Sequence, residues 1–148
     1  MKSKIRLGIV GVGQIGKVHL NNYAKIPGAE MVAAADINEA ELKTVAEQFK
    51  IPYTYTNFRK LLERDDIDAV DVCLHNNLHA PVTIAALQAG KHVYCEKPMA
   101  GAYFDAKAMF DTARRCARNL SIQLSTLFAK ETKVAKRLIN EGRLGHIY

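Results

Sequence analysis

A glycine-rich run, Gly11-Val12-Gly13-Gln14-Ile15-Gly16, constrains this sequence more than any other feature. It follows the apolar segment 5–10 and precedes apolar residues at helical spacing, so it joins an expected strand to an expected helix. At such a turn Gly11 permits the sharp bend, Gly13 lets the backbone approach a pyrophosphate, and Gly16 lets the helix pack closely on the sheet. The helix N-terminus adds N–H groups and a positive dipole. The spacing alone is a weak signal, but its position between strand and helix predicts a dinucleotide-binding turn.

The rest of the chain alternates short β-branched segments with helical patterns. This alternation predicts an α/β fold, a doubly wound, mostly parallel Rossmann-type sheet with helices on both faces. Ligands of such sheets bind beyond the carboxyl ends of the strands, where the strand order reverses. The residues directly after each strand are therefore the candidates for a binding site. We predict strands at 5–10, 31–36, 53–56, 69–74, 92–95 and 121–124.

Asp36 ends the second expected strand, and it follows Gly16 by twenty positions. A carboxylate there can accept hydrogen bonds from both ribose hydroxyls of an adenosine. It would repel a 2′-phosphate, and the next residues, Ile37 and Asn38, supply no arginine to bind one. The sequence therefore predicts NAD in preference to NADP. The alternative role for Asp36 is a helix N-cap, but Asn38, with Glu41 three residues later, suits that role better.

Composition excludes several other classes of protein. The chain has 148 residues and a formal charge of +6, and 49% of its residues are hydrophobic, which is typical of a globular domain. Its apolar segments are too short to cross a bilayer, and its start lacks a signal-peptide pattern, so we expect a cytoplasmic protein without membrane contact. A basic cluster at Arg114, Arg115 and Arg118 has no aromatic residues interleaved with it, so we interpret it as a solvated helix face and expect no nucleic-acid binding.

The three cysteines and the first histidine suggest no metal chemistry. Cysteine and histidine do not occur together at ligand spacing, so we predict neither a metal site nor a disulfide. His19 lies in the first expected helix, and we interpret it as a packing histidine with satisfied hydrogen bonds. The cysteines are Cys73, Cys95 and Cys116. Two of them, Cys73 and Cys95, fall in apolar strands, and we interpret these two as buried, inert thiols.

Four segments of the sequence resemble the glucose–fructose oxidoreductase/inositol dehydrogenase (Gfo/Idh/MocA) family. They are Leu74-His75-Asn76-Asn77-Leu78-His79, residues 85–93, Glu96-Lys97-Pro98, and residues 136–147. The resemblance covers essentially the whole chain, and its most specific part is the context of Glu96-Lys97-Pro98. The family usually has proline where this chain has His75, so the shape of that loop departs from the family pattern.

The resemblance implies roles for individual residues. In the family the lysine that matches Lys97 is catalytic, the residue that matches Glu96 lies against the cofactor, and the proline that matches Pro98 is often preceded by a cis bond. An amine just past a strand end can accept a proton from a substrate hydroxyl, particularly when it is desolvated. The alternative is an ordinary surface lysine before a turn. Asn76 and His79 match positions near the nicotinamide and its ribose, although His79 can equally be a helix-start residue. The predicted cofactor contacts are thus Gly11, Gly13, Gln14, Ile15, Gly16, Asp36, Asn76, His79, Glu96 and Lys97.

The resemblance also implies a reaction and a second domain. It implies an NAD-dependent oxidoreductase that transfers hydride between the cofactor and a secondary alcohol of a sugar, cyclitol or related polyol. Family members carry a further α+β substrate domain, through which we expect a homo-oligomer to form. We therefore expect 1–125 to be the Rossmann domain and 126–148 to be a connecting helix and the start of a truncated substrate domain, its first strand at 146–148. A fragment of this kind would bind cofactor without turnover. The alternatives are a non-catalytic dinucleotide-binding regulator and an NAD-assisted glycosidase.

Overall fold

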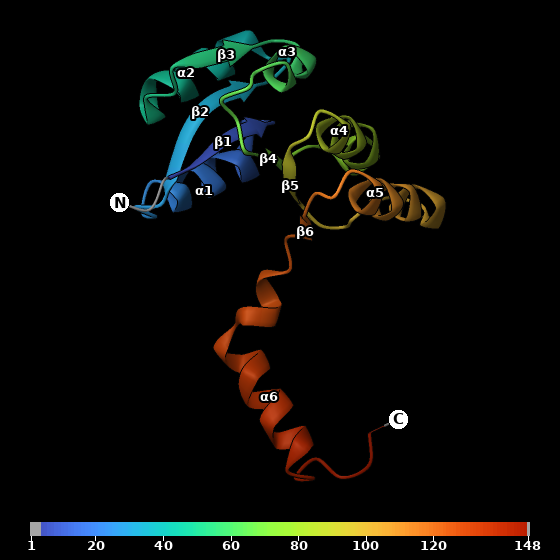
Figure 1. The fold of residues 1–148 in the computed structure, drawn as a ribbon. Coiled ribbons are helices and arrows are strands. Elements are labelled where there is room, and N and C mark those ends of the chain that lie inside the picture. Colours follow the sequence, from blue (N-terminus) through green and yellow to red (C-terminus); the bar gives the residue numbers. More distant parts are fainter. Residues whose placement is uncertain (1–3, 148) are drawn as a thin grey trace.

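The computed structural model describes residues 4–147, and most of them form a single parallel sheet with helices on both faces (Figure 1). The six strands lie in the order β3-β2-β1-β4-β5-β6, and every neighbouring pair is parallel. The order reverses between β1 and β4, as expected of a doubly wound Rossmann-type sheet. The predicted fold class is therefore confirmed. The strands are β1 (Ile5–Val10), β2 (Ala29–Ala35), β3 (Tyr53–Tyr55), β4 (Ala69–Val72), β5 (His92–Cys95) and β6 (Leu120–Ile122).

Two hydrophobic cores form, one on each face of the sheet, because neighbouring residues of a strand point to opposite sides. Ile9 is buried against α1 and α2 together with Leu20 and Val45. Val10 is buried on the other face, in the core that includes Leu87 of α4 and Met109 of α5. A strand that is buried on both faces has a continuous apolar sequence, so the sequence alone predicted the strand at 5–10. The helices are α1 (Gln14–Tyr23), α2 (Glu39–Phe49), α3 (Phe58–Leu62), α4 (Asn76–Gln88), α5 (Tyr103–Arg115), the 3-10 helix η1 (Ser125–Phe128) and α6 (Lys130–Asn140).

Several boundaries differ from the prediction by a few residues. Strand β2 ends at Ala35, because Asp36 leaves the strand direction and its carboxylate accepts hydrogen bonds from backbone N–H groups. Helix α4 begins at Asn76, three residues before the predicted start at His79. The prediction followed the apolar stripe, whereas α4 starts with the exposed Asn76 and Asn77, which do not belong to such a stripe.

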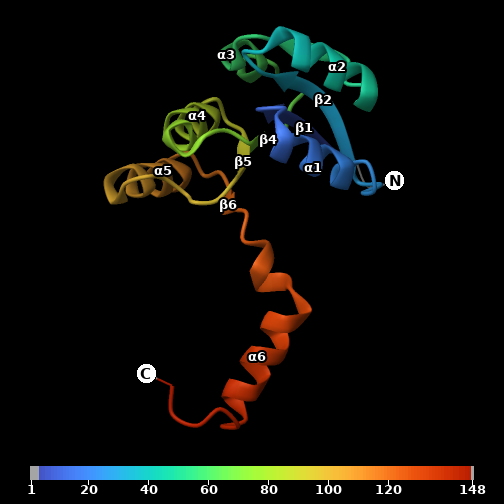
Figure 2. The same cartoon turned by 180° about the vertical axis from the view of Figure 1, so that it is seen from behind.

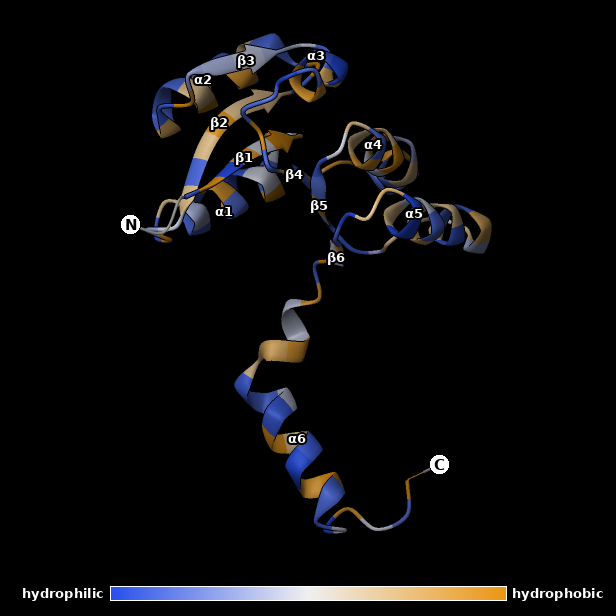
Figure 3. Cartoon of the chain, in the orientation of Figure 1, coloured by the Kyte–Doolittle hydropathy of each residue, from blue (hydrophilic) through white to orange (hydrophobic). Residues whose placement is uncertain are grey.

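Helix α6 extends away from the sheet after β6 (Figures 1 and 2). Hydrophilic and hydrophobic residues alternate along it (Figure 3), and its apolar residues Val134 and Ile139 are 37% and 47% exposed. Residues 145–147 form no regular structure, so the predicted strand is absent there; Tyr148 lies outside the described residues. A lone strand has no partner for its backbone groups, which explains the difference. The division at 125/126 stays a prediction. Within 4–147, no helix has both the length and the apolar content needed to span a bilayer.

The conformation of Gly11 generates a prediction about stability. Its φ is +94°, and a Cβ added to it would lie 2.2 Å from the Cys73 carbonyl oxygen. We expect Gly11→Ala to lower the free energy of unfolding by at least ~2 kcal/mol, through backbone strain and displacement of the Cys73 carbonyl, directly after β4. Urea denaturation measures this change. Gly28→Ala is the matched control, since its Cβ would have no atom within 4 Å. Equal stability of the two variants would contradict the prediction.

Candidate functional site

A cleft of about 780 Å³ lies beyond the carboxyl ends of β1, β2 and β4, at the point where the strand order reverses. Four residues of the glycine run and Asp36 line it, as the sequence predicted for this edge of the sheet. The cleft therefore brings the predicted phosphate turn and the predicted ribose acid into one space. Its wall consists of Val10, Gly11, Gly13, Gln14, Ile15, Ala35, Asp36, Ile37, Thr56, Asn57, Phe58, Arg59, Cys73, Leu74, His75, Leu78 and Val82.

The glycines of the turn have different structural roles. A Cβ on Gly16 would lie 2.2 Å from the carbonyl oxygen of Gly11, so Gly16 allows α1 to pack against the end of β1. A Cβ on Gly13, in contrast, would have no protein atom within 4 Å, and the φ of Gly13 is −65°, which any residue can adopt. The fold itself therefore does not require glycine at 13. Gly13 is also the N-cap of α1 and has no side chain to cap it, so the first N–H groups of this helix stay available to a ligand.

Asp36 is fixed in place by two backbone N–H donors. Its Oδ2 accepts a hydrogen bond from Val12 N–H at 2.9 Å, and its Oδ1 accepts one from Asn38 N–H at 2.9 Å. Asn38 in turn caps α2, since its Oδ1 accepts from Glu41 N–H at 3.2 Å, as predicted. A carboxylate has about four lone-pair positions, so both oxygens of Asp36 can still accept from ribose hydroxyls. Its link to Val12 also joins the end of β2 to the glycine turn.

The predicted catalytic segment follows β5 at the same edge of the sheet. Glu96 is buried and Lys97 is exposed, and the Lys97–Pro98 peptide bond is cis. The Lys97 N–H donates a hydrogen bond of 2.9 Å to Glu96 Oε2. Asn76, the first residue of α4, is exposed next to His75 of the cleft wall. The structure thus brings Asn76, Glu96 and Lys97 to the edge that holds the cleft, and their contacts with a cofactor stay a prediction.

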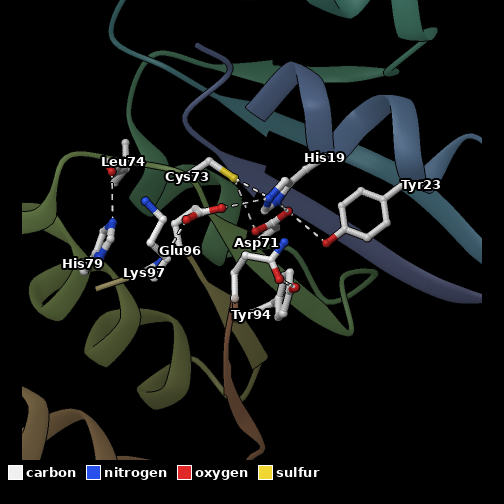
Figure 4. A network of polar contacts seen from close by, with 10 residues as sticks. His19, Tyr23, Asp71, Cys73, Leu74, His79, Tyr94, Glu96 and Lys97 are labelled. Atoms are coloured by element: carbon white, nitrogen blue, oxygen red, sulfur yellow. Dashed lines mark hydrogen bonds and ion pairs between the residues drawn. The ribbon is translucent and has the colours of Figure 1, made fainter. Parts of the chain in front are cut away.

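His79 joins two loops. It is fully buried, its Nδ1 lies 2.7 Å from the Pro98 carbonyl oxygen, and its Nε2 lies 3.0 Å from the Leu74 carbonyl oxygen. These contacts connect the loop after β4 to the loop after β5, and Figure 4 shows the contact with Leu74. The imidazole therefore lies beneath the loops and not on the cleft wall, where we expected a cofactor contact. The contact of His79 with a cofactor therefore stays a prediction.

A buried polar network lies under helix α1 and ends at Glu96 (Figure 4). His19 Nδ1 lies 2.8 Å from Asp71 Oδ2, and His19 Nε2 lies 3.2 Å from Glu96 Oε1. The hydrogen bond with Asp71 raises the pKa of His19, and the charges of Asp71 and Glu96 add to this effect against the cost of burial. Tyr23 donates its hydroxyl to Asp71 Oδ2 at 2.9 Å, and burial raises the pKa of this phenol. His19 is therefore buried and hydrogen-bonded, as predicted, and its partners are two carboxylates.

Three donor atoms of this network are close enough to one another to be compared with a metal site. Those of His19, Asp71 and Cys73 all lie within 4.8 Å of one another. The Cys73 sulfur lies 3.3 Å from His19 Nδ1, and its S–H donates to Asp71 Oδ1 at 3.4 Å. Burial raises the pKa of the Cys73 thiol, which disfavours the thiolate that a metal would need. Hydrogen bonds account for the cluster, and the absence of a metal centre stays a prediction.

Sequence reasoning missed two groups of residues at this edge. Ile37, Arg59 and Leu78 line the cleft, and each follows a strand end closely enough that the strand pattern could have indicated it. The second group is the pairing of Asp71 with His19. An acid inside the otherwise apolar strand β4 requires a buried partner, and this signal was present in the sequence. Which residue provides that partner depends on how α1 packs on the sheet.

Comparison with known proteins decides the family. The sequence model of the Gfo/Idh/MocA oxidoreductase family, described as having an NAD-binding Rossmann fold, matches residues 5–124. The chain belongs to this family. The resemblance inferred from Glu96-Lys97-Pro98 and the other segments is therefore confirmed. Membership also explains why the glycine turn and Asp36 share one cleft, because that cleft is the dinucleotide site of the fold.

Individual members of the Gfo/Idh/MocA family resemble the chain over almost its entire length. D-glucoside 3-dehydrogenase of Escherichia coli is 34% identical over 147 residues, which cover 99% of this chain and 42% of that protein. Myo-inositol 2-dehydrogenase of Thermotoga maritima is 30% identical over 141 residues, which cover 95% of this chain and 42% of that protein. The WlbA dehydrogenase of Chromobacterium violaceum, solved with NADH and UDP-GlcNAcA, is 30% identical with a TM-score of 0.94, covering 100% and 43%. The chain therefore spans less than half the length of these relatives.

Gly13 provides a test of the dinucleotide site that leaves the fold intact. We expect Gly13→Ala to keep the stability of the parent within about 0.5 kcal/mol, because the new methyl group meets no protein atom. The methyl group would occupy the space through which a pyrophosphate approaches, so we expect dinucleotide affinity to fall at least about tenfold. Calorimetric titration and urea denaturation measure the two effects. Unchanged affinity in a stable variant would show that the phosphate does not approach Gly13.

Proposed function

We propose that the protein containing this chain is an NAD-dependent dehydrogenase that acts on a secondary alcohol of a sugar, cyclitol or related polyol. The observation that carries this proposal is the shared sheet edge: the glycine turn and Asp36 line the cleft there, and Lys97 follows β5 at the same edge. The space left open at Gly13 fits a dinucleotide phosphate. Relatives named as inositol and glucoside dehydrogenases support the class of substrate.

The preference for NAD over NADP rests on Asp36. Its carboxylate is held at the cleft by Val12 N–H and Asn38 N–H, so it cannot turn away from a ribose without breaking these hydrogen bonds. A 2′-phosphate would place further negative charge beside it. Arg59 also lines the cleft and carries the opposite charge, but its guanidinium lies over the Phe58 ring, 4.8 Å from the centroid. The fixed carboxylate of Asp36 therefore favours NAD, in which both hydroxyls of the adenosine ribose are free.

Lys97 is the proposed proton acceptor. NAD, when bound, supplies the acceptor for the hydride that leaves the alcohol carbon. The hydroxyl proton must leave in the same oxidation, and the Lys97 amine takes it and becomes an ammonium. Two features orient this residue: its N–H is bonded to the buried Glu96 carboxylate, and the next residue's carbonyl is bonded to His79. The exposed side chain of Lys97 extends from a backbone that is held on both sides.

Lys97→Met tests the proposed proton transfer. In the full-length protein we expect NAD reduction by a polyol to fall about 10²–10⁴-fold, the usual contribution of a positioned acid–base group. NAD affinity should stay within a few-fold, because Lys97 does not line the cleft that holds the phosphate turn. Absorbance at the NADH band and calorimetry measure the two quantities across a panel of polyols.

Lys107→Met is the matched control for this experiment, since it removes another exposed lysine whose ammonium is bonded to Asp111 on α5. It should leave the rate unchanged. Full activity of Lys97→Met would remove Lys97 from the mechanism. A wild-type protein that binds NAD but oxidises none of the polyols would favour a regulator, and cofactor that remains bound without net NADH would favour a glycosidase.

Asp36→Ala tests the cofactor preference. We expect the affinity for NAD to fall about 10–100-fold, the value of hydrogen bonds to a charged group. The affinity for NADP should fall much less or rise, because the repulsion of its 2′-phosphate is removed. Calorimetry measures both dissociation constants. General damage to the glycine turn would weaken the binding of both cofactors equally, so the ratio of the two constants reports the effect of Asp36 alone. Tighter binding of NADP than of NAD by the parent chain would contradict the proposed preference.

A further inference from the structure

His19 occupies an unusual position between two buried carboxylates. Its Nδ1 faces Asp71 Oδ2 at 2.8 Å and its Nε2 faces Glu96 Oε1 at 3.2 Å, while the side chains of the three residues are 5%, 1% and 8% exposed. An ionised carboxylate only accepts hydrogen bonds, so both ring nitrogens must donate. With both acids ionised, this geometry fits an imidazolium at 19, with one positive charge between the two acids.

The remaining groups around the ring agree with this charge state. Tyr23 and Cys73 both donate to Asp71, through O–H and S–H, so they satisfy the acid without withdrawing a proton from His19. The Tyr94 ring packs at 5.9 Å between centroids, and its hydroxyl donates to Gln123. The hydrogen bond to Asp71 is also the main reason why the pKa of His19 is raised. The Cys73 sulfur also lies 3.3 Å from Nδ1, and among the described residues no ionisable group besides Asp71, Glu96 and Cys73 is hydrogen-bonded to this ring.

The network extends from His19 to the predicted catalytic residue. Glu96 uses one oxygen for His19 and the other, Oε2, to accept from Lys97 N–H at 2.9 Å. The two oxygens of a carboxylate are rigidly connected, so the imidazolium that fixes Oε1 also fixes the direction of Oε2. Figure 4 shows His19 between Asp71 and Glu96, with Lys97 beside Glu96.

We propose that His19 is a positioning residue: it orients the Glu96 carboxylate, which orients the backbone of Lys97 for the proton transfer described above. This inference rests on the proposed function for its catalytic consequence, but the link itself can be tested without activity. Without His19, two buried carboxylates face each other with no cation between them, and Glu96 moves away from Asp71. The hydrogen bond from Lys97 N–H is then lost.

Hydrogen exchange at the Lys97 amide tests the link directly. In His19→Gln, we expect this amide to exchange at least about tenfold faster than in the wild-type full-length protein, read by mass spectrometry on overlapping peptides. The glutamine amide reaches only one of the two carboxylates. His92→Gln is the control, because His92 is a histidine outside the network whose Nδ1 accepts from Asn119 N–H. Equal exchange at Lys97 in all three proteins would overturn the proposal.

The pH dependence of stability tests the charge on the ring. A histidine whose folded-state pKa is raised stabilises the fold fully below its unfolded value, about 6.5, and this contribution is lost as pH rises through the folded-state pKa. The urea midpoint of His19→Gln should therefore lie furthest below that of the wild type near pH 6, and the gap should narrow as pH rises. A gap that stays constant would show a neutral ring and overturn the proposal.

If His19→Gln does not fold, NMR of the wild-type protein tests the proposal. The ¹⁵N shifts of the His19 imidazole should show a doubly protonated ring at pH 7.5, where an unperturbed histidine has lost its proton. A neutral ring at that pH would overturn the proposal.

Kinetics separate positioning from general damage. We expect His19→Gln to lower kcat about tenfold or more while KM for NAD changes less than threefold, since α1 keeps its phosphate turn. Loss of NAD affinity with unchanged kcat would overturn the positioning role. If the wild-type protein has no polyol activity but the Lys97 amide responds to His19→Gln, the proposed function fails while the link from His19 to Lys97 stands.

Discussion

The close approach of helix α1 to the end of strand β1 is the constraint on which the rest of this structure depends. Gly16 faces the Gly11 carbonyl with no room for a Cβ, and Gly11 faces the Cys73 carbonyl of the neighbouring strand in the same way. These contacts fix the start of α1 over the strand ends, where its free N–H groups face the cleft. They also place His19 above Asp71. One tight packing arrangement thus serves both the phosphate turn and the buried network.

Carboxylates in two different surroundings define the two ends of the site. Asp36 is half-buried and receives only backbone N–H donors, so its charge is directed toward a ligand in the cleft. Asp71 and Glu96 are buried, and their charge is directed inward to His19. A buried charge without a partner is costly, so Asp71 and Glu96 depend on the proposed imidazolium of His19 between them. In the functions we propose, Asp36 binds the cofactor, whereas Asp71 and Glu96 with His19 align the loop that carries Lys97.

Local features of the sequence could be predicted, whereas contacts between distant segments could not. The glycine turn, Asp36 and the strands follow from turn chemistry and apolar segments, which depend on neighbouring residues. Lys97 was recognisable because its neighbours carry a family pattern. The pairing of His19 with Glu96 joins residues 77 positions apart and depends on the packing of α1. Arg59 follows the end of β3, so the strand pattern could have indicated it, but its place in the cleft wall depends on the pairing of β3 with β2. Burial of His79 likewise follows from the arrangement of two loops.

Helix α1 begins at Gln14 on the cleft wall and carries the network residue His19 five positions later. In an α-helix five residues correspond to roughly 7.5 Å, and each residue turns the helix by about 100°. The helix therefore sets a fixed distance and a fixed angle between the two ends of the site. A single residue inserted or deleted between Gly16 and His19 would keep the phosphate turn intact but rotate the imidazole away from both acids. The number of residues between the glycine turn and His19 is thus constrained, independently of which residues occupy these positions.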